Sequence, residues 1–250
     1  MASNPPGACC ASGFKHEGTP IGETKNISGA IVSQSTPTLF IPRITRPPEK
    51  AVVILSDIFG IYVNSQLLAD EFAANGYLCI IPDLFRGDAI KVSDMESGNV
   101  DLASWISKHQ FAVIDPVVES TIKYVREDLG IKKVGSVGYC FGGKYVCRFL
   151  KPGKFDVGYT AHPSFVTNEE LAGIAGPLSI AASEIDQIFT AELRHESEGI
   201  LIKTGLPWQI NLFSGVSHGF AVRADLSNKH FKFAKEQAFC QAVVWFNQHL

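Results

Sequence analysis

Short apolar runs alternate along this chain with longer segments whose apolar residues recur every three or four positions. Apolar runs rich in β-branched residues are typical of strands buried on both faces of a sheet, and the second pattern is typical of amphipathic helices. The predicted strands cover residues 51–55, 78–81, 133–137, 157–161, 178–181 and 209–213, and the clearest predicted helices cover 67–72, 113–129 and 229–250.

The alternation of strand and helix predicts one α/β domain with a mostly parallel sheet and helices on both faces. Residues 1–38 lack a sustained period, so we expect an N-terminal arm, extended or in short edge strands, packed on a domain that covers residues 39–250. Three prolines in and beside residues 43–50 predict a turn. In the helix predicted over 113–129, we expect Val125 and Leu129 to share the apolar side.

Composition and charge remove several classes of function. The 22 basic and 25 acidic residues give a net charge of −3 without a basic stripe, so we expect no nucleic-acid partner. No apolar run approaches the roughly 20 residues that cross a bilayer. The first twelve residues lack the charged start and apolar segment of a secretory signal. We therefore expect no membrane association and a cytoplasmic location; nothing in the sequence indicates the oligomeric state.

Cysteine spacing excludes two further classes. The chain has six cysteines, too sparse and uneven for a disulfide framework, and no Cys or His pairs at the spacing of a zinc site. We therefore expect no metal. Most of these thiols are expected to be small buried hydrophobic side chains. The six cysteines are Cys9, Cys10, Cys79, Cys140, Cys147 and Cys240.

One cysteine stands in a motif that predicts chemistry. Gly138-Tyr-Cys140-Phe-Gly142 follows a predicted strand and precedes a helical pattern, which is the form of a nucleophile elbow with cysteine in place of serine. The glycines allow the strained turn, and the start of the helix favours a thiolate and an oxyanion. The alternative is a glycine-rich packing turn around an inert cysteine.

A nucleophile of this kind needs an acid and a base, which follow it along the chain in this architecture. Asp186 and His218 each come just after a predicted strand, where open α/β sheets build their sites. Glu184 is a rival for the acid, and Asp186 is favoured because it lies where the loop turns toward the next helix. His162 also follows a strand and either lines a pocket or is a structural histidine.

Four motifs together resemble the dienelactone hydrolase (carboxymethylenebutenolidase) family over residue 39 to the C-terminus, and the N-terminal stretch resembles its fungal and other eukaryotic members. The four motifs are Ser56-Asp57-Ile58-Phe59-Gly60, Pro82-Asp83-Leu84-Phe85, Gly138-Tyr139-Cys140-Phe141-Gly142-Gly143 and Ser217-His218-Gly219-Phe220.

The resemblance implies an α/β-hydrolase fold, a Cys140–His218–Asp186 triad and no metal or organic cofactor. It implies that the backbone N–H groups of Ile58 and Phe141 bind the oxyanion. Asp57 stands where bacterial members have a glutamate that holds and activates the thiol, so its gating role is an open question.

For the substrate site, Arg86 and Arg223 are candidates to bind a substrate carboxylate, although each is equally well explained as a surface cation. Six aromatic residues predict an apolar pocket, although several of the six are expected to lie in the core. The six are Phe59, Tyr62, Phe85, Tyr139, Phe141 and Phe220.

The resulting hypothesis is a hydrolase that cleaves a small-molecule lactone or ester through a thioester on Cys140. One alternative is a hydrolase or cyclase with the same triad that acts on a polyketide-type intermediate in a biosynthetic pathway. A second alternative is a non-catalytic binding protein on the same fold.

Overall fold

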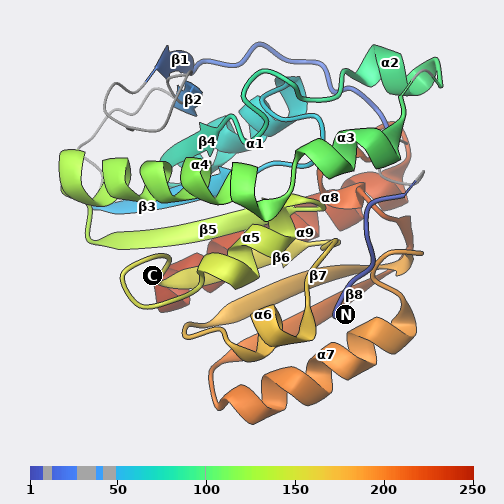
Figure 1. Cartoon of the computed structure of the whole chain (residues 1–250). Helices are drawn as coiled ribbons and strands as arrows, with labels where there is room; N and C mark the ends of the chain where they lie inside the picture. Colours follow the sequence, from blue (N-terminus) through green and yellow to red (C-terminus); the bar gives the residue numbers. More distant parts are fainter. Residues whose placement is uncertain (8–12, 27–37, 42–48, 99) are drawn as a thin grey trace.

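The structure is a computed structural model of the chain, and it describes residues 1–7, 13–26, 38–41, 49–98 and 100–250. Cys9, Cys10 and most of the turn predicted over 43–50 lie outside the described residues. An eight-stranded sheet forms the centre, with helices on both sides (Figure 1). The predicted α/β fold with a mostly parallel sheet is confirmed.

The six predicted strands begin within one residue of their predicted positions, and the pattern of buried apolar runs explains this agreement. The last two end four residues later than predicted. In chain order they are β1 (Glu23–Asn26), β2 (Thr38–Ile41), β3 (Lys50–Leu55), β4 (Leu78–Pro82), β5 (Lys133–Tyr139), β6 (Val157–Ala161), β7 (Leu178–Ile185) and β8 (Trp208–Ser217).

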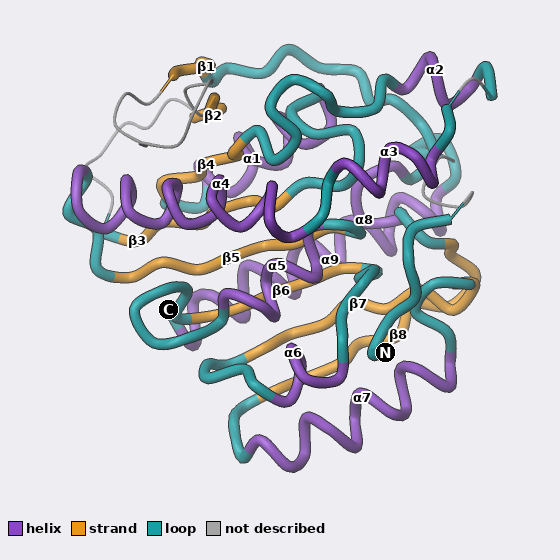
Figure 2. Tube along the Cα trace, in the orientation of Figure 1, coloured by secondary structure: helices purple, strands orange, loops and turns teal. Residues whose placement is uncertain are grey.

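The strands lie in the order β1-β2-β4-β3-β5-β6-β7-β8. The pairs from β4 to β8 are parallel, while β1 and β2 add an antiparallel edge. Because parallel strands end at the same edge of a sheet, the segments after β3, β5, β6, β7 and β8 meet there. Figure 2 shows the strands as one twisted layer between the helices.

The helices are α1 (Val63–Ala74), α2 (Val92–Glu96), α3 (Leu102–Lys108), α4 (Phe111–Lys123), the π-helical turn η2 (Tyr124–Asp128), α5 (Gly142–Phe149), α6 (Asn168–Ala172), α7 (Ala191–Thr204), α8 (Phe220–Arg223) and α9 (Lys229–His249). Within the described chain, none of them combines the length and apolar character that a membrane span requires.

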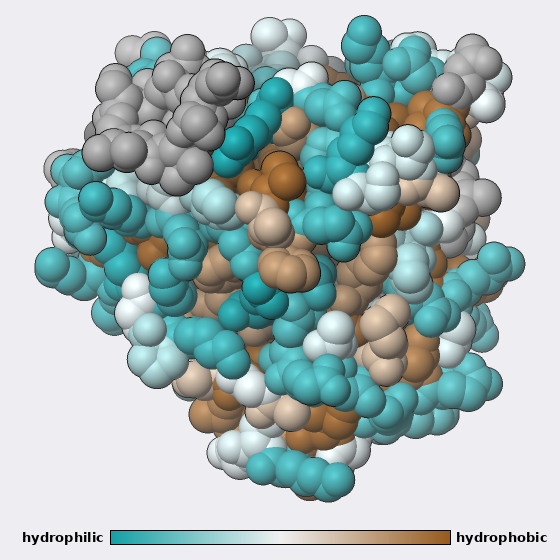
Figure 3. Space-filling view, viewed as in Figure 1, coloured by the Kyte–Doolittle hydropathy of each residue, from teal (hydrophilic) through white to brown (hydrophobic). Residues whose placement is uncertain are grey.

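Two hydrophobic cores lie on the two faces of the sheet. In β3, Ala51, Val53 and Leu55 join the core under α4, α5 and α7, while Val52 and Ile54 join the core under α1 and α9. This alternation follows from the two-residue period of a strand. The face in Figure 3 is mostly hydrophilic, with smaller hydrophobic areas between, because surface helices turn their polar sides to solvent.

The helix predicted over 113–129 differs from expectation at its end. It begins at Phe111 and changes from α-helix to the wider η2 turn, in which the Leu129 N–H donates to the Tyr124 carbonyl. A π turn rotates the following residues away from the α-helical face. Val125 is therefore fully buried while Leu129 is 39% exposed, so the prediction that they share the apolar side is wrong.

Candidate active site

Cys140 lies at the sharp turn between β5 and α5. Its φ of 50° falls in the left-handed region, which few residues other than glycine adopt. The flanking glycines have no room for a side chain. A Cβ on Gly142 would lie 1.9 Å from the Leu55 carbonyl oxygen, and one on Gly138 would lie 2.6 Å from the Gly142 carbonyl oxygen. The two glycines therefore allow β5, β3 and α5 to approach closely at the cysteine.

The segment after β6 supports Cys140 from the neighbouring strand. The Cys140 N–H donates to the Ala161 carbonyl over 3.2 Å, and the Ser164 N–H donates to the Cys140 carbonyl over 3.0 Å. The fully buried Ser164 also places its hydroxyl oxygen 3.7 Å from the Cys140 sulfur. Ser164 was not predicted; the only signal in the sequence is its position two residues after His162, just past a strand.

Asp186 and His218 form a buried pair at the ends of β7 and β8. His218 Nδ1 lies 2.9 and 3.1 Å from the two oxygens of the Asp186 carboxylate. The N–H groups of Ile188 and Phe189 and the Ser183 hydroxyl also donate to this carboxylate. Burial favours the neutral acid, but the hydrogen bonds and the charge of His218 outweigh it and lower the pKa of Asp186. The carboxylate is therefore charged at neutral pH.

His218 also interacts with Cys140. Burial by itself lowers the pKa of His218, but the negative charge of the Cys140 sulfur and the hydrogen bonds to Asp186 and Cys140 outweigh it and raise the pKa to about 10. This arrangement favours a thiolate paired with an imidazolium. Glu184, the rival acid, is exposed and accepts instead from the Gly215 N–H.

Asp57 lies just after β3, and its buried carboxylate makes an ion pair and hydrogen bonds. Its carboxylate pairs with the Arg223 guanidinium and accepts from the Tyr62 hydroxyl and the Phe59 N–H, both over 3.1 Å. Burial raises the pKa of Asp57; Arg223 opposes this rise and a negative Cys140 adds to it. Asp57 therefore interacts with the thiol through charge.

The two arginines predicted for a substrate carboxylate have different surroundings. The Arg223 side chain is 4% exposed, pairs with Asp57 and lies over the Phe59 ring at 5.3 Å from its centroid. Arg86 is exposed at the turn after β4. The structure thus brings Arg223 but not Arg86 into the cluster around Asp57.

The predicted oxyanion donors lie at the ends of neighbouring strands. Phe141 directly follows Cys140, and Ile58 directly follows Asp57; both are buried. The pairing of Leu55 with Gly138 brings the ends of β3 and β5 side by side. The two backbone N–H groups therefore belong to the same part of the sheet edge as Cys140.

His162 is fully buried against three rings. Its ring centroid lies 4.9 Å from that of His218, 5.8 Å from Phe220 and 6.2 Å from Tyr139. Neither ring nitrogen has a hydrogen-bond partner among the described residues. Burial lowers the pKa of His162 well below its usual value, so the ring is neutral beside the charged His218.

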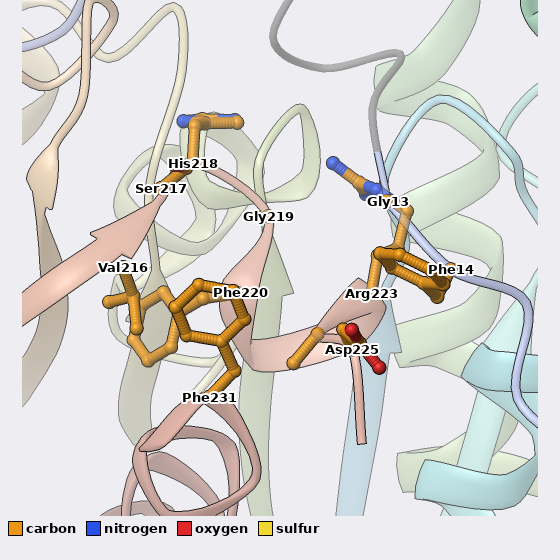
Figure 4. A pocket seen from close by; sticks show the side chains of 11 residues that line it. Gly13, Phe14, Val216, Ser217, His218, Gly219, Phe220, Arg223, Asp225 and Phe231 are labelled. Atoms are coloured by element: carbon orange, nitrogen blue, oxygen red, sulfur yellow. The ribbon is translucent and has the colours of Figure 1, made fainter. Parts of the chain in front are cut away.

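A cavity of about 190 Å³ opens beside His218 (Figure 4). Of the aromatic residues predicted to line a pocket, only Phe220 borders it; Phe85 and Phe141 instead pack with Trp105 in a separate aromatic cluster. The lining residues are Gly13, Phe14, Val216, Ser217, His218, Gly219, Phe220, Arg223, Ala224, Asp225 and Phe231.

The N-terminal arm contributes to this region at two places. Ser3 exchanges hydrogen bonds with Val166, and the Asn4 N–H donates to the Ile188 carbonyl, two residues from Asp186. Farther along, the Phe14 N–H donates to the Arg223 carbonyl over 3.0 Å. Sequence reasoning missed these contacts, because nothing in the arm's composition indicates where it docks.

Metal chemistry was not expected from the sequence. Among the described residues, no three His, Cys, Asp or Glu side chains are grouped so that they could hold a metal ion.

Comparison with known proteins supports this interpretation of the fold. The family described as "Dienelactone hydrolase family" matches residues 38–250. A solved dienelactone hydrolase from Anabaena variabilis has the same fold, with a TM-score of 0.66 and 13% identity over 92% of this chain and 99% of that one.

Two fungal relatives match nearly the whole chain. Hydrolase pyvD of Aspergillus violaceofuscus is 49% identical over 100% of this chain and 99% of its own length. Dienlactone hydrolase 1 of Gibberella moniliformis is 31% identical over 99% of this chain and 95% of its own length. The chain belongs to the dienelactone hydrolase family, has the α/β-hydrolase fold and is an ester or lactone hydrolase.

Proposed function

We propose that the chain cleaves its ester or lactone substrate with Cys140 as the nucleophile, His218 as general acid and base, and Asp186 as the residue that orients His218. The observation that carries the proposal is the buried hydrogen-bonded line from Asp186 through His218 to Cys140. Its position at the carboxyl edge of the sheet is where such folds place their chemistry.

In the first half of the reaction, the Cys140 thiolate attacks the carbonyl carbon, and the N–H groups of Ile58 and Phe141 bind the oxyanion. The C–O bond then breaks while the His218 imidazolium gives its proton to the leaving oxygen, which leaves a thioester. With a pKa of about 10, His218 holds this proton throughout the neutral range.

In the second half, neutral His218 takes a proton from water, and the resulting hydroxide attacks the thioester carbon. The C–S bond breaks, the acid is released and the thiolate–imidazolium pair is restored. The Asp186 carboxylate stabilises the imidazolium and fixes its orientation in both halves.

The test replaces the nucleophile. Cys140→Ala is expected to lower kcat/KM on phenyl acetate by about 1,000-fold or more, as loss of a nucleophile does in other triads. The wild-type chain should gain one acetyl group on Cys140, detectable by mass spectrometry after rapid quenching. Cys147→Ala is the matched control, because Cys147 is also a buried thiol, on α5, and takes no part in the proposed reaction. Near-normal turnover by Cys140→Ala would contradict the proposal.

The pathway alternative uses the same three side chains. A hydrolase or cyclase for a polyketide-type intermediate would differ in its substrate and not in its triad, so this alternative stays a prediction. It is tested by measuring whether the protein turns over intermediates made by enzymes that neighbouring genes encode. Membership of a hydrolase family argues against the non-catalytic alternative.

A further inference from the structure

The segment that follows β6 brings a hydroxyl group to the nucleophile. Ser164 is fully buried, and its hydroxyl oxygen lies 3.7 Å from the Cys140 sulfur, which is within hydrogen-bond reach of an atom as large as sulfur. Among the described residues, this sulfur is the one hydrogen-bond partner of the hydroxyl. The triad as proposed gives the hydroxyl no role, although it touches the reacting atom.

The chemistry of the two groups decides the direction of this hydrogen bond. A hydroxyl has one proton to donate, whereas a thiolate has none. Because pairing with the His218 imidazolium favours the Cys140 thiolate, the Ser164 hydroxyl donates and the sulfur accepts. A hydrogen bond to the charged form of a group favours that form. The hydroxyl therefore stabilises the thiolate relative to the thiol.

The backbone around Ser164 is held in a conformation that few residues adopt. His162, with a φ of 40°, and Phe165, with a φ of 63°, both lie in the left-handed region. The His162 N–H donates to a carbonyl of β7 over 2.8 Å, and the Phe165 N–H donates to a carbonyl of the N-terminal arm over 2.9 Å. Such conformations persist only where the surroundings enforce them. Contacts with two other parts of the chain thus fix the hydroxyl beside the sulfur.

Other ionisable groups also act on the thiol. His218, after β8, carries a positive charge and hydrogen-bonds to the sulfur, and Asp57, after β3, interacts with it through charge. Arg223, on α8, is paired with Asp57. His162, on the same segment as Ser164, is neutral. Removing the Ser164 hydroxyl leaves these groups in place, so a change in the charge state of the thiol would report the lost hydrogen bond.

We propose that Ser164 is a further catalytic residue, whose hydroxyl donates a hydrogen bond to the Cys140 thiolate and keeps the nucleophile charged in mildly acidic solution. The hydroxyl retains its proton, and no covalent bond to it forms or breaks. The inference rests on the proposed function, because the thiolate is the reacting group only if Cys140 is the nucleophile.

The experiment measures the pH profile of kcat/KM on phenyl acetate for Ser164→Ala. The acid limb of this profile follows conversion of the reactive thiolate to the thiol. We expect the limb to move up by about one pH unit, because a hydrogen bond to a charged group changes such an equilibrium by about 10-fold or more. The plateau at higher pH should stay close to that of the wild type, since the thiolate is then formed in both proteins.

A measurement without turnover checks the same shift. The ultraviolet absorbance of the thiolate, taken as the difference between each protein and the same protein carrying Cys140→Ala, should rise at a pH about one unit higher in Ser164→Ala than in the wild type. Circular dichroism across the pH range separates loss of the thiolate from loss of the fold.

Ser136→Ala is the matched control, because Ser136 is a fully buried serine of β5 whose hydroxyl has no hydrogen-bond partner in the described part of the chain. It should leave the acid limb in place. Ser164→Thr keeps the hydroxyl and adds a methyl group, so it should lose stability through overpacking but retain the wild-type acid limb.

An unmoved acid limb in Ser164→Ala, or an equal shift in Ser136→Ala or Ser164→Thr, would overturn the inference. Failure of the proposed function is distinguishable, since it would show as activity retained by Cys140→Ala, whatever the position of the limb.

Discussion

At the scale of single residues, the ion pair of Asp57 and Arg223 is a deeply buried charge contact near the thiol, with side chains 1% and 4% exposed. Asp57→Asn keeps the shape but leaves the guanidinium without its carboxylate, so we expect the free energy of unfolding to fall by about 3 kcal/mol. Because the remaining positive charge favours a thiolate, alkylation of Cys140 should shift to lower pH. Urea unfolding and the pH profile of iodoacetamide labelling measure the two effects.

Asp115→Asn provides the comparison for this variant. Asp115 pairs with Arg148 in a bidentate contact, but the two side chains are 22% and 31% exposed. Solvent screens this pair, so its loss should cost no more than about 1 kcal/mol. If both variants lose the same stability, burial is not what makes the Asp57 pair important.

At the scale of elements, the docking of the N-terminal arm depends on Gly13. Its φ is 138°, and a Cβ there would lie 2.4 Å from the Arg223 Cβ. We expect Gly13→Ala to displace the arm and cost about 1–3 kcal/mol. Hydrogen exchange should show loss of protection at the Phe14 amide, which donates to Arg223.

Gly7→Ala is the control within the same arm, because a Cβ on Gly7 meets nothing within 4 Å. It should leave the Phe14 amide protected. Unchanged exchange at Phe14 in Gly13→Ala would show that the arm does not depend on this close approach.

At the scale of the whole molecule, the buried neutral His162 makes stability depend on pH. Its folded pKa lies well below 6.5, so below that pH the unfolded chain binds a proton that the folded chain does not. Stability therefore falls as pH decreases, by up to about 1.4 kcal/mol per pH unit for this one group. Between pH 6.5 and pH 5, the free energy of unfolding of His162→Phe should therefore fall by up to about 2 kcal/mol less than that of the wild type.

Urea unfolding of both proteins at pH 5, 6 and 7.5 measures this difference. Burial also lowers the pKa of His16, so the stability of the variant should still fall in acid, but by less than that of the wild type. Parallel pH curves for wild type and His162→Phe would mean that His162 is protonated in the folded protein.

The strands and the nucleophile turn could be predicted from local sequence because their causes are local. A strand buried on both faces needs an apolar run, and the elbow needs glycines at 138 and 142. Leu129 was placed wrongly because a π turn changes the helical period that the prediction assumed. The division at residue 38 stays a prediction.

The surroundings of the site could not be predicted, since they depend on contacts between distant parts of the chain. Ser164 reaches Cys140, and Arg223 reaches Asp57, only because β3, β5, β6 and β8 end at one edge of the sheet.

The sequence by itself determined the α/β fold, the family and the candidate nucleophile, because apolar period and glycine spacing act on the local backbone. Only the tertiary structure decided that Asp186 rather than Glu184 meets His218, that Arg223 is held by Asp57, and that the arm places Phe14 at the cavity. Charge pairs and cavities form where segments that are distant in the sequence come into contact, and the positions of these segments in the sequence do not indicate which of them will do so.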